Sequence, residues 1–88
     1  LSEVEIQLSR YGQSQLRRRE LAAAEQSALA ALGAAEVLYE QGLVDELPVF
    51  IARRAHLART LELIASETET AQALVGLYRA LGGGWEAL

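Results

Sequence analysis

The chain has 88 residues, 51% of them apolar, contains no cysteine and carries a formal net charge of −4. This length corresponds to one domain or to part of one. The lack of cysteine excludes a disulfide framework and a thiolate metal site. The acidic balance excludes the general basic surface that binds the phosphate backbone of nucleic acids.

The sequence shows neither a signal peptide nor a starting methionine, so we expect it to be an excised or processed part of a longer protein. No run of uninterrupted apolar residues approaches the ~18 that a membrane-spanning helix needs. Leucine and alanine dominate, proline occurs once, and all of the positive charge is arginine. This composition favours long helices and predicts an all-α fold.

Helical spacing of apolar residues predicts a first helix from about residue 2 to residue 41. Its early apolar positions are Leu1, Val4, Leu8 and Tyr11, and its later ones are Leu21, Ala24, Ala28, Ala31, Ala35 and Leu38. Because ten residues separate Tyr11 from Leu21, the spacing predicts a break in phase between the two sets. The arginine run 17–19 follows this polar stretch and indicates a solvated helix face.

Residues 42–46 are predicted to form the corner between two helices. Gly42 suits the position just after a helix end, and Asp45 suits an N-cap followed by Glu46 in the next first turn. Pro48 fits inside that first turn, where no amide donor is needed. A connection this short joins antiparallel neighbours.

The second predicted helix runs from about residue 47 to residue 81. Apolar and small residues follow an unbroken heptad seam through Phe50, Arg54, Leu57, Leu61, Ile64, Thr68, Ala71, Val75 and Tyr78. A tail of residues 82–88 follows, in which Gly82, Gly83, Gly84 and Trp85 are predicted to stop the helix. Either Trp85 covers Tyr78 and Leu81 in a cap, or the glycines let it fold back onto another surface.

Together these elements predict one domain, residues 1–88, folded as a long antiparallel helical hairpin of the coiled-coil kind. Two helices cover only one stripe of each other, yet apolar residues lie on more than one face. We therefore expect further helices beside both arms, from the rest of a longer chain or from other copies. The isolated fragment is expected to form a dimer or a higher assembly.

Residues capable of catalysis or metal binding do not gather in the sequence. His56 has no second ligand at helical spacing, and Glu62, Glu67 and Glu69 spread around a helix. The glycines of "GGGW" neither follow a strand nor open a helix, which excludes a phosphate-binding loop. No catalytic, cofactor-binding or metal-binding residue is predicted, and we do not expect an enzyme.

Three motifs resemble one known family. The opening "SEVEIQL" is similar to the "EVE-x-x-L" helix start of TolC-like outer-membrane efflux proteins. The corner "LYEQGLVDELPVFIARR" resembles their "Y-x-x-G-x-x-x-x-L-x-V-L-D-A-x-R" tip, and the ending "ALVGLYRALGGGWE" resembles the "LYKALGGGW" end of the efflux lipoprotein branch. The match spans nearly the whole chain, and the last motif is the most specific.

The resemblance implies a segment of an outer-membrane channel that exports drugs, metal ions or other small solutes through a tripartite pump. Such a channel is a homotrimer with a β-barrel in the outer membrane of a Gram-negative bacterium and an α-helical barrel in the periplasm. This segment would be a hairpin of that helical barrel. Its corner would face the periplasmic adaptor protein, which connects the channel to the inner-membrane pump.

By this resemblance the tip pattern falls on Tyr39, Gly42, Leu47, Val49, Ala52 and Arg54. The resemblance and the predicted turn together give an adaptor-docking tip consisting of Tyr39, Gly42, Leu43, Val44, Asp45, Glu46, Leu47 and Val49. Exposed apolar residues rimmed by acidic ones are typical of a protein-binding end. Alternatively, Leu43 and Val44 fold back onto Leu38 and Leu47 and are structural.

The sequence departs from the family where acidic residues are usual. Ile51 stands at the acid of "L-D-A", and Pro48 and Ala52 occupy two neighbouring positions that are often acidic. Asp45 and Glu46 are close enough in sequence to replace them. A second interpretation, a soluble helical dimerisation module of a regulatory protein, explains the heptads equally well. It gives no reason for the corner motif or the triple glycine.

Overall fold

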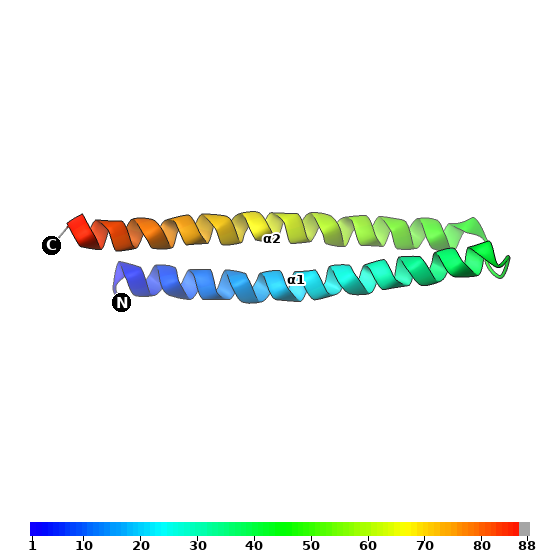
Figure 1. The fold of residues 1–88 in the computed structure, drawn as a ribbon, viewed down its shortest axis with the longest axis horizontal. Helices are drawn as coiled ribbons and strands as arrows, with labels where there is room; N and C mark the ends of the chain where they lie inside the picture. Colours follow the sequence, from blue (N-terminus) through cyan, green and yellow to red (C-terminus); the bar gives the residue numbers. More distant parts are fainter. Residues whose placement is uncertain (87–88) are drawn as a thin grey trace.

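The chain folds into two long antiparallel helices that lie side by side over most of their length (Figure 1). The structure is a computed structural model that describes the backbone of residues 1–86 and the side chains of residues 1–82. Helix α1 spans Glu3–Glu40 and helix α2 spans Glu46–Glu86, and the hairpin measures 70 × 14 × 14 Å. The predicted all-α antiparallel hairpin is confirmed.

The N-terminus of α1 is capped by a side chain. Ser2 has extended backbone angles, and its hydroxyl accepts a hydrogen bond from the Glu5 amide at 3.1 Å. Glu3 and Glu5 lie in the first turn, where carboxylates interact favourably with the positive end of the helix dipole. This cap satisfies one of the amides that a helix start leaves without an intrahelical partner.

The corner begins with a Schellman motif at the end of α1. The Gly42 amide donates to the Tyr39 carbonyl, and the Leu43 amide donates to the Leu38 carbonyl, both at 2.9 Å. Gly42 has a φ of +75°, the left-handed conformation that this motif requires and that glycine adopts without steric cost. The prediction that Gly42 ends the first helix is confirmed.

The second helix is longer than predicted. It begins at Glu46, with Pro48 in its first turn, and continues through the three glycines to Glu86. The prediction of a helix stop at Gly82–Trp85 is therefore wrong. A glycine that ends a helix in a Schellman or αL motif has a left-handed backbone, and within residues 1–86 the positive-φ glycine is Gly42. The side chain of Trp85, for which a cap or a tether was expected, lies outside the described residues.

The face of α1 that packs on α2 forms one continuous seam. Buried or half-buried residues recur at alternating steps of three and four, at Val4, Gln7, Tyr11, Ser14, Arg18, Leu21, Glu25, Ala28, Leu32 and Ala35. The predicted phase break after Tyr11 is wrong, because polar Ser14 and Arg18 occupy the seam positions between Tyr11 and Leu21. Arg18 is half-buried and bonds to Gln15, so it is not part of a fully solvated face.

The face of α2 that packs on α1 is not the predicted heptad seam. Its buried or half-buried residues are Val49, Ala52, His56, Thr60, Leu63, Ser66, Thr70, Ala73, Leu74, Gly76, Leu77 and Ala80. The predicted seam from Phe50 to Tyr78 is exposed at every position. We name it the outer stripe of α2. The small side chains of Ser66 and Ala73 leave room for the facing helix, which explains why the bulkier positions turn outward.

The core between the helices is narrow. Among the described residues, Leu32, Val49 and Ala73 are the buried apolar side chains and Ser66 is the buried polar one. Thr70 adds a polar contact, since its hydroxyl lies 3.3 Å from the Ser14 carbonyl across the interface and 3.0 Å from the Ser66 carbonyl of its own helix, so one hydrogen is shared between the two. A hairpin with so little buried apolar surface needs further contacts to be very stable.

By length and composition alone, α1 is long and apolar enough to cross a membrane. Much of its apolar content is alanine, and acidic residues interrupt it at Glu20, Glu25 and Glu36. A helix that packs against several neighbours in a helical assembly has the same composition.

Candidate functional site

The end of the molecule at residues 39–47 carries large apolar side chains that face solvent. Tyr39 from the end of α1, Leu43 from the corner and Leu47 from the start of α2 are 46%, 67% and 63% exposed. Gly42 positions Leu43, because its left-handed backbone reverses the chain directly before that residue. Leu43 does not fold back onto α1, whereas Val44 is half-buried.

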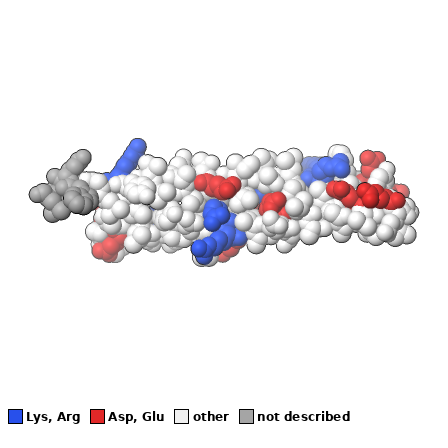
Figure 2. Space-filling view, viewed as in Figure 1, with Lys and Arg blue, Asp and Glu red and all other residues white. Residues whose placement is uncertain are grey.

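Acidic side chains surround these apolar residues. Glu40, Asp45 and Glu46 are all exposed at the same end of the hairpin, and Figure 2 shows acidic groups gathered there, at the right of the view. The ion pairs within the described residues lie elsewhere on the helices. The corner carboxylates are therefore free to attract a positively charged partner. We name Tyr39, Leu43 and Leu47, with these three acidic residues, the corner surface.

The structure brings most of the predicted tip residues together but gives them different roles. Val49 is 4% exposed and packs toward α1, so it supports the corner from inside and does not present a contact surface. Ile51, at the position where the resemblance expects an acid, is 58% exposed. Ala52 is half-buried against α1, so an acidic side chain there would be partly desolvated.

A polar pair that the sequence did not predict joins the two helices near their middle. His56 Nε2 lies 2.8 Å from Glu25 Oε1, and the two side chains are 24% and 17% exposed. Both residues lie on the packed faces of their helices, but 31 residues separate them along the chain. The spacing of residues within one helix therefore could not predict this contact. Within the described residues no group of three His, Cys, Asp or Glu side chains is placed to bind a metal ion. The pair aligns the helices.

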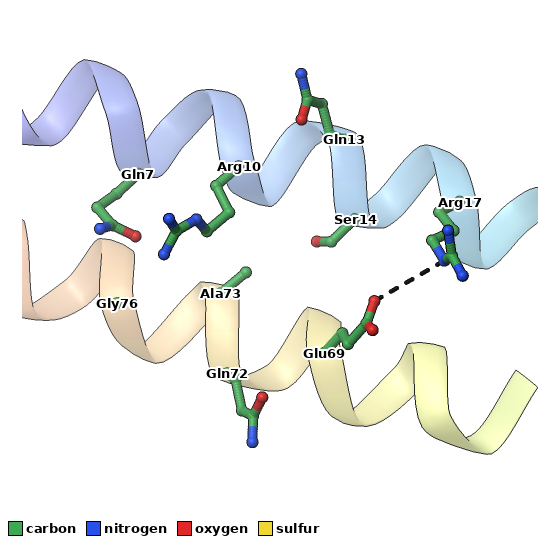
Figure 3. A pocket seen from close by; sticks show the side chains of 9 residues that line it. All are labelled: Gln7, Arg10, Gln13, Ser14, Arg17, Glu69, Gln72, Ala73 and Gly76. Atoms are coloured by element: carbon green, nitrogen blue, oxygen red, sulfur yellow. Dashed lines mark ion pairs between the residues drawn. The ribbon is translucent and has the colours of Figure 1, made fainter. Parts of the chain in front are cut away.

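A polar groove lies between the helices on the half away from the corner (Figure 3). It encloses about 450 Å³ and is lined by Gln7, Arg10, Gln13, Ser14, Arg17, Glu69, Gln72, Ala73 and Gly76. Gln7 and Arg10 point from α1 toward α2, and Arg17 Nε lies 3.9 Å from Glu69 Oε2. Both members of that ion pair are more than half exposed, so their attraction is weakened by water.

The groove exists because α2 has small residues there. A Cβ placed on Gly76 would lie 2.7 Å from the side-chain oxygen of Gln7, so Gln7 uses the space that glycine leaves. The lining contains no nucleophile beside a general base, and its polar groups face open solvent. The groove therefore gives no indication of catalysis, and the corner surface is the stronger candidate for function.

Comparison with known proteins supports the channel resemblance over most of the chain. The chain is 40% identical to outer membrane protein OprJ of Pseudomonas aeruginosa over 73 residues. The matched part is 81% of this chain and 15% of OprJ, so the chain spans a small part of that protein's length. No protein-family model and no solved structure matches the chain.

Proposed function

We propose that this chain is a hairpin of the outer-membrane channel component of a tripartite efflux pump. The similarity to OprJ, an outer membrane protein, carries this proposal, because it covers 81% of the chain at 40% identity. The helical hairpin and the order of the three motifs are the further support. In this role the segment forms part of a periplasmic α-helical barrel within a homotrimer. The "GGGW" ending favours the lipoprotein branch of these channels.

We propose that the corner surface docks the periplasmic adaptor protein. Three observations support this role: the corner lies at one end of a 70 Å hairpin, its large apolar side chains are exposed, and unpaired carboxylates surround them. Exposed apolar residues within a charged rim are the usual composition of a protein-binding surface. Asp45 and Glu46 are exposed beside Leu47, and we propose that they supply the negative charge missing at Pro48, Ile51 and Ala52.

A chimeric channel tests this proposal. The segment of OprJ that aligns with this chain is replaced by the hairpin, and assembly in the outer membrane, trimer formation and drug accumulation are measured. A chimera that assembles and keeps drug accumulation low supports the proposed role. A chimera that never reaches the outer membrane, although the hairpin is folded, contradicts it.

Docking is tested in the same chimera by Leu43→Ser with Leu47→Ser. The matched control is Leu8→Ser with Leu16→Ser, which changes two leucines that are 56% and 57% exposed on α1, far from the corner. We expect the corner variant to form trimers, to lose cross-linking to the adaptor and to accumulate drug. Normal cross-linking and normal drug accumulation would contradict docking, and loss of the trimer would show that the corner leucines are structural.

The alternative function is a soluble helical dimerisation module of a regulatory protein. The exposed outer stripe of α2 suits a helical partner in either case, so this feature does not separate the two functions. The similarity to OprJ favours the channel.

A further inference from the structure

One side of the hairpin carries polar and small residues over most of its length. It is the side on which the polar groove opens, and we name it the groove side (Figure 3). Steps of three and four from the groove-lining residues extend it over residues 10–34 of α1 and 55–79 of α2. Its members are Arg10, Gln13, Arg17, Glu20, Ala24, Ser27, Ala31 and Ala34 on α1, and Ala55, Ala58, Glu62, Ala65, Glu69, Gln72, Gly76 and Arg79 on α2. None of these side chains is large and apolar.

The opposite side of the hairpin carries exposed large apolar residues. Leu8 and Leu29 on α1 are 56% and 45% exposed, and Leu57 and Ile64 on α2 are 57% and 53% exposed. Each lies five residues before a member of the groove side, which places it about 140° away around the helix. The two sides therefore suit different surroundings.

Arg10 is a free positive charge in the groove. It points from α1 toward α2 (Figure 3), and it takes part in none of the ion pairs within the described residues. Arg17 is held loosely by Glu69, at 3.9 Å. Two guanidinium groups therefore share one carboxylate in the groove lining, which leaves a net positive charge there. A guanidinium binds carboxylate or phosphate oxygens through two parallel hydrogen bonds.

The place of the groove side in a helical barrel follows from the other faces of α2. Each helix in the wall of such a barrel has a neighbour on each flank. One flank of α2 contacts α1, and the exposed apolar outer stripe on the far side from α1 suits the next helix of the wall. The two remaining sides face the interior and the exterior. A passage for solutes is filled with water, and a wall without large apolar side chains is the less costly one to hydrate.

We propose that the groove side lines the passage through the channel and that Arg10 contacts the anionic groups of solutes that pass through it. This inference rests on the proposed function. In a homotrimer Arg10 occurs three times at one level and forms a ring of positive charge. Rings of arginine favour anions in pores. The solutes that this ring favours are organic anions, such as compounds that carry a carboxylate.

Ion selectivity tests the role of Arg10. The chimera of OprJ and this hairpin is reconstituted as a trimer in a planar bilayer, and the reversal potential is measured across a potassium chloride gradient. We expect Arg10→Gln to lower the chloride-to-potassium permeability ratio by at least about 1.5-fold, because the ring loses its charge. Arg10→Lys keeps the charge and should keep the ratio.

The matched control is Arg19→Gln, which removes the same charge from an exposed position of α1. Arg19 lies nine residues after Arg10, about two and a half helical turns, and is therefore on the opposite side. We expect Arg19→Gln to leave the permeability ratio unchanged. Equal shifts for the two variants, or no shift for Arg10→Gln, would overturn the inference.

Charge added at single cysteines tests which side lines the passage, because the hairpin has no cysteine of its own. Gln13→Cys on the groove side and Leu8→Cys on the opposite side are treated with a negatively charged thiosulfonate reagent during single-channel recording, and the chimera without either substitution is the blank. We expect conductance to change by at least about 1.2-fold for Gln13→Cys and to stay constant for Leu8→Cys. A change for Leu8→Cys, or for neither variant, would overturn the inference and leave the proposed function standing. A chimera that forms no conducting trimer would overturn both.

Discussion

The face of α2 that packs on α1 contains small and polar side chains, whereas the opposite face carries most of the large apolar ones. Ser66 and Ala73 are 2% and 6% exposed, while Leu57 and Leu61 on the outer stripe are 57% and 58% exposed. Around Ser66 and Ala73, burial on α2 therefore follows the size and fit of the side chains, although apolar Val49, Leu63 and Leu77 also lie on the packed face. Small residues let the two backbones lie close together, and the larger apolar residues remain for contacts outside the hairpin.

The largest expected effect comes from enlarging the packed face. Ala73→Leu adds volume where α2 meets α1, and we expect it to lower the free energy of unfolding by about 1–3 kcal/mol. Ala55→Leu, at an exposed position of the same helix, should leave stability nearly unchanged. Urea unfolding at equal protein concentration, followed by circular dichroism, measures both. If the two variants lose equal stability, the packed face has been assigned wrongly.

The corner provides a comparison between two glycines. Gly42 has a φ of +75°, so Gly42→Ala forces a side chain into the left-handed region and should cost about 1–2 kcal/mol of unfolding free energy. Gly33 lies inside α1 with open space around its Cβ position, and Gly33→Ala should add about 0.5–1 kcal/mol through helix propensity. Thermal unfolding of the two variants should shift in opposite directions. A shift in the same direction would contradict the Schellman motif.

The smallest expected effect is the difference in coupling energy between the Glu25–His56 pair, which joins the helices, and the Arg59–Glu62 pair on the surface. A double-mutant cycle with Glu25→Gln and His56→Gln should give a coupling energy of about 0.5–1.5 kcal/mol, because the 2.8 Å contact is mostly shielded from water. The corresponding cycle on Arg59 and Glu62, whose side chains are 47% and 46% exposed, should give less than about 0.5 kcal/mol. Denaturant unfolding at fixed pH provides both values. A larger coupling for the surface pair would show that His56 does not align the helices.

The sequence predicted the hairpin because its signals are local. Gly42 and Pro48 marked the corner within a few residues of where the structure places it, and leucine with alanine predicted both helices. A local signal also gave a wrong prediction: the three glycines predicted the end of the second helix, whereas α2 continues to Glu86. Glycine permits a left-handed turn but does not impose it, and the neighbouring sequence keeps the backbone helical.

The sequence of α2 alone could not predict which of its faces packs against α1. Phe50 and Leu57 gave the stronger heptad signal, but the contact with α1 uses Ala52, His56 and Ser66, which are small or polar. Which stripe faces the partner depends on how closely two particular backbones can approach, and that is a property of both helices. The same reason explains why the Glu25–His56 contact was not predicted, whereas the exposed corner residues were predicted from sequence position.

The most direct test of this account is the reactivity of cysteines placed on the two faces of α2. Ser66→Cys and Ile64→Cys lie two residues apart and are separately introduced into a Leu61→Asp background, in which a charge on the outer stripe opposes association of the chain with other copies. Ser66 is 2% exposed and Ile64 is 53% exposed, so a maleimide should label the cysteine at Ser66 at least about 10-fold more slowly. Rapid labelling at Ser66 with protection at Ile64 would show that the heptad seam packs on α1, and would contradict the account.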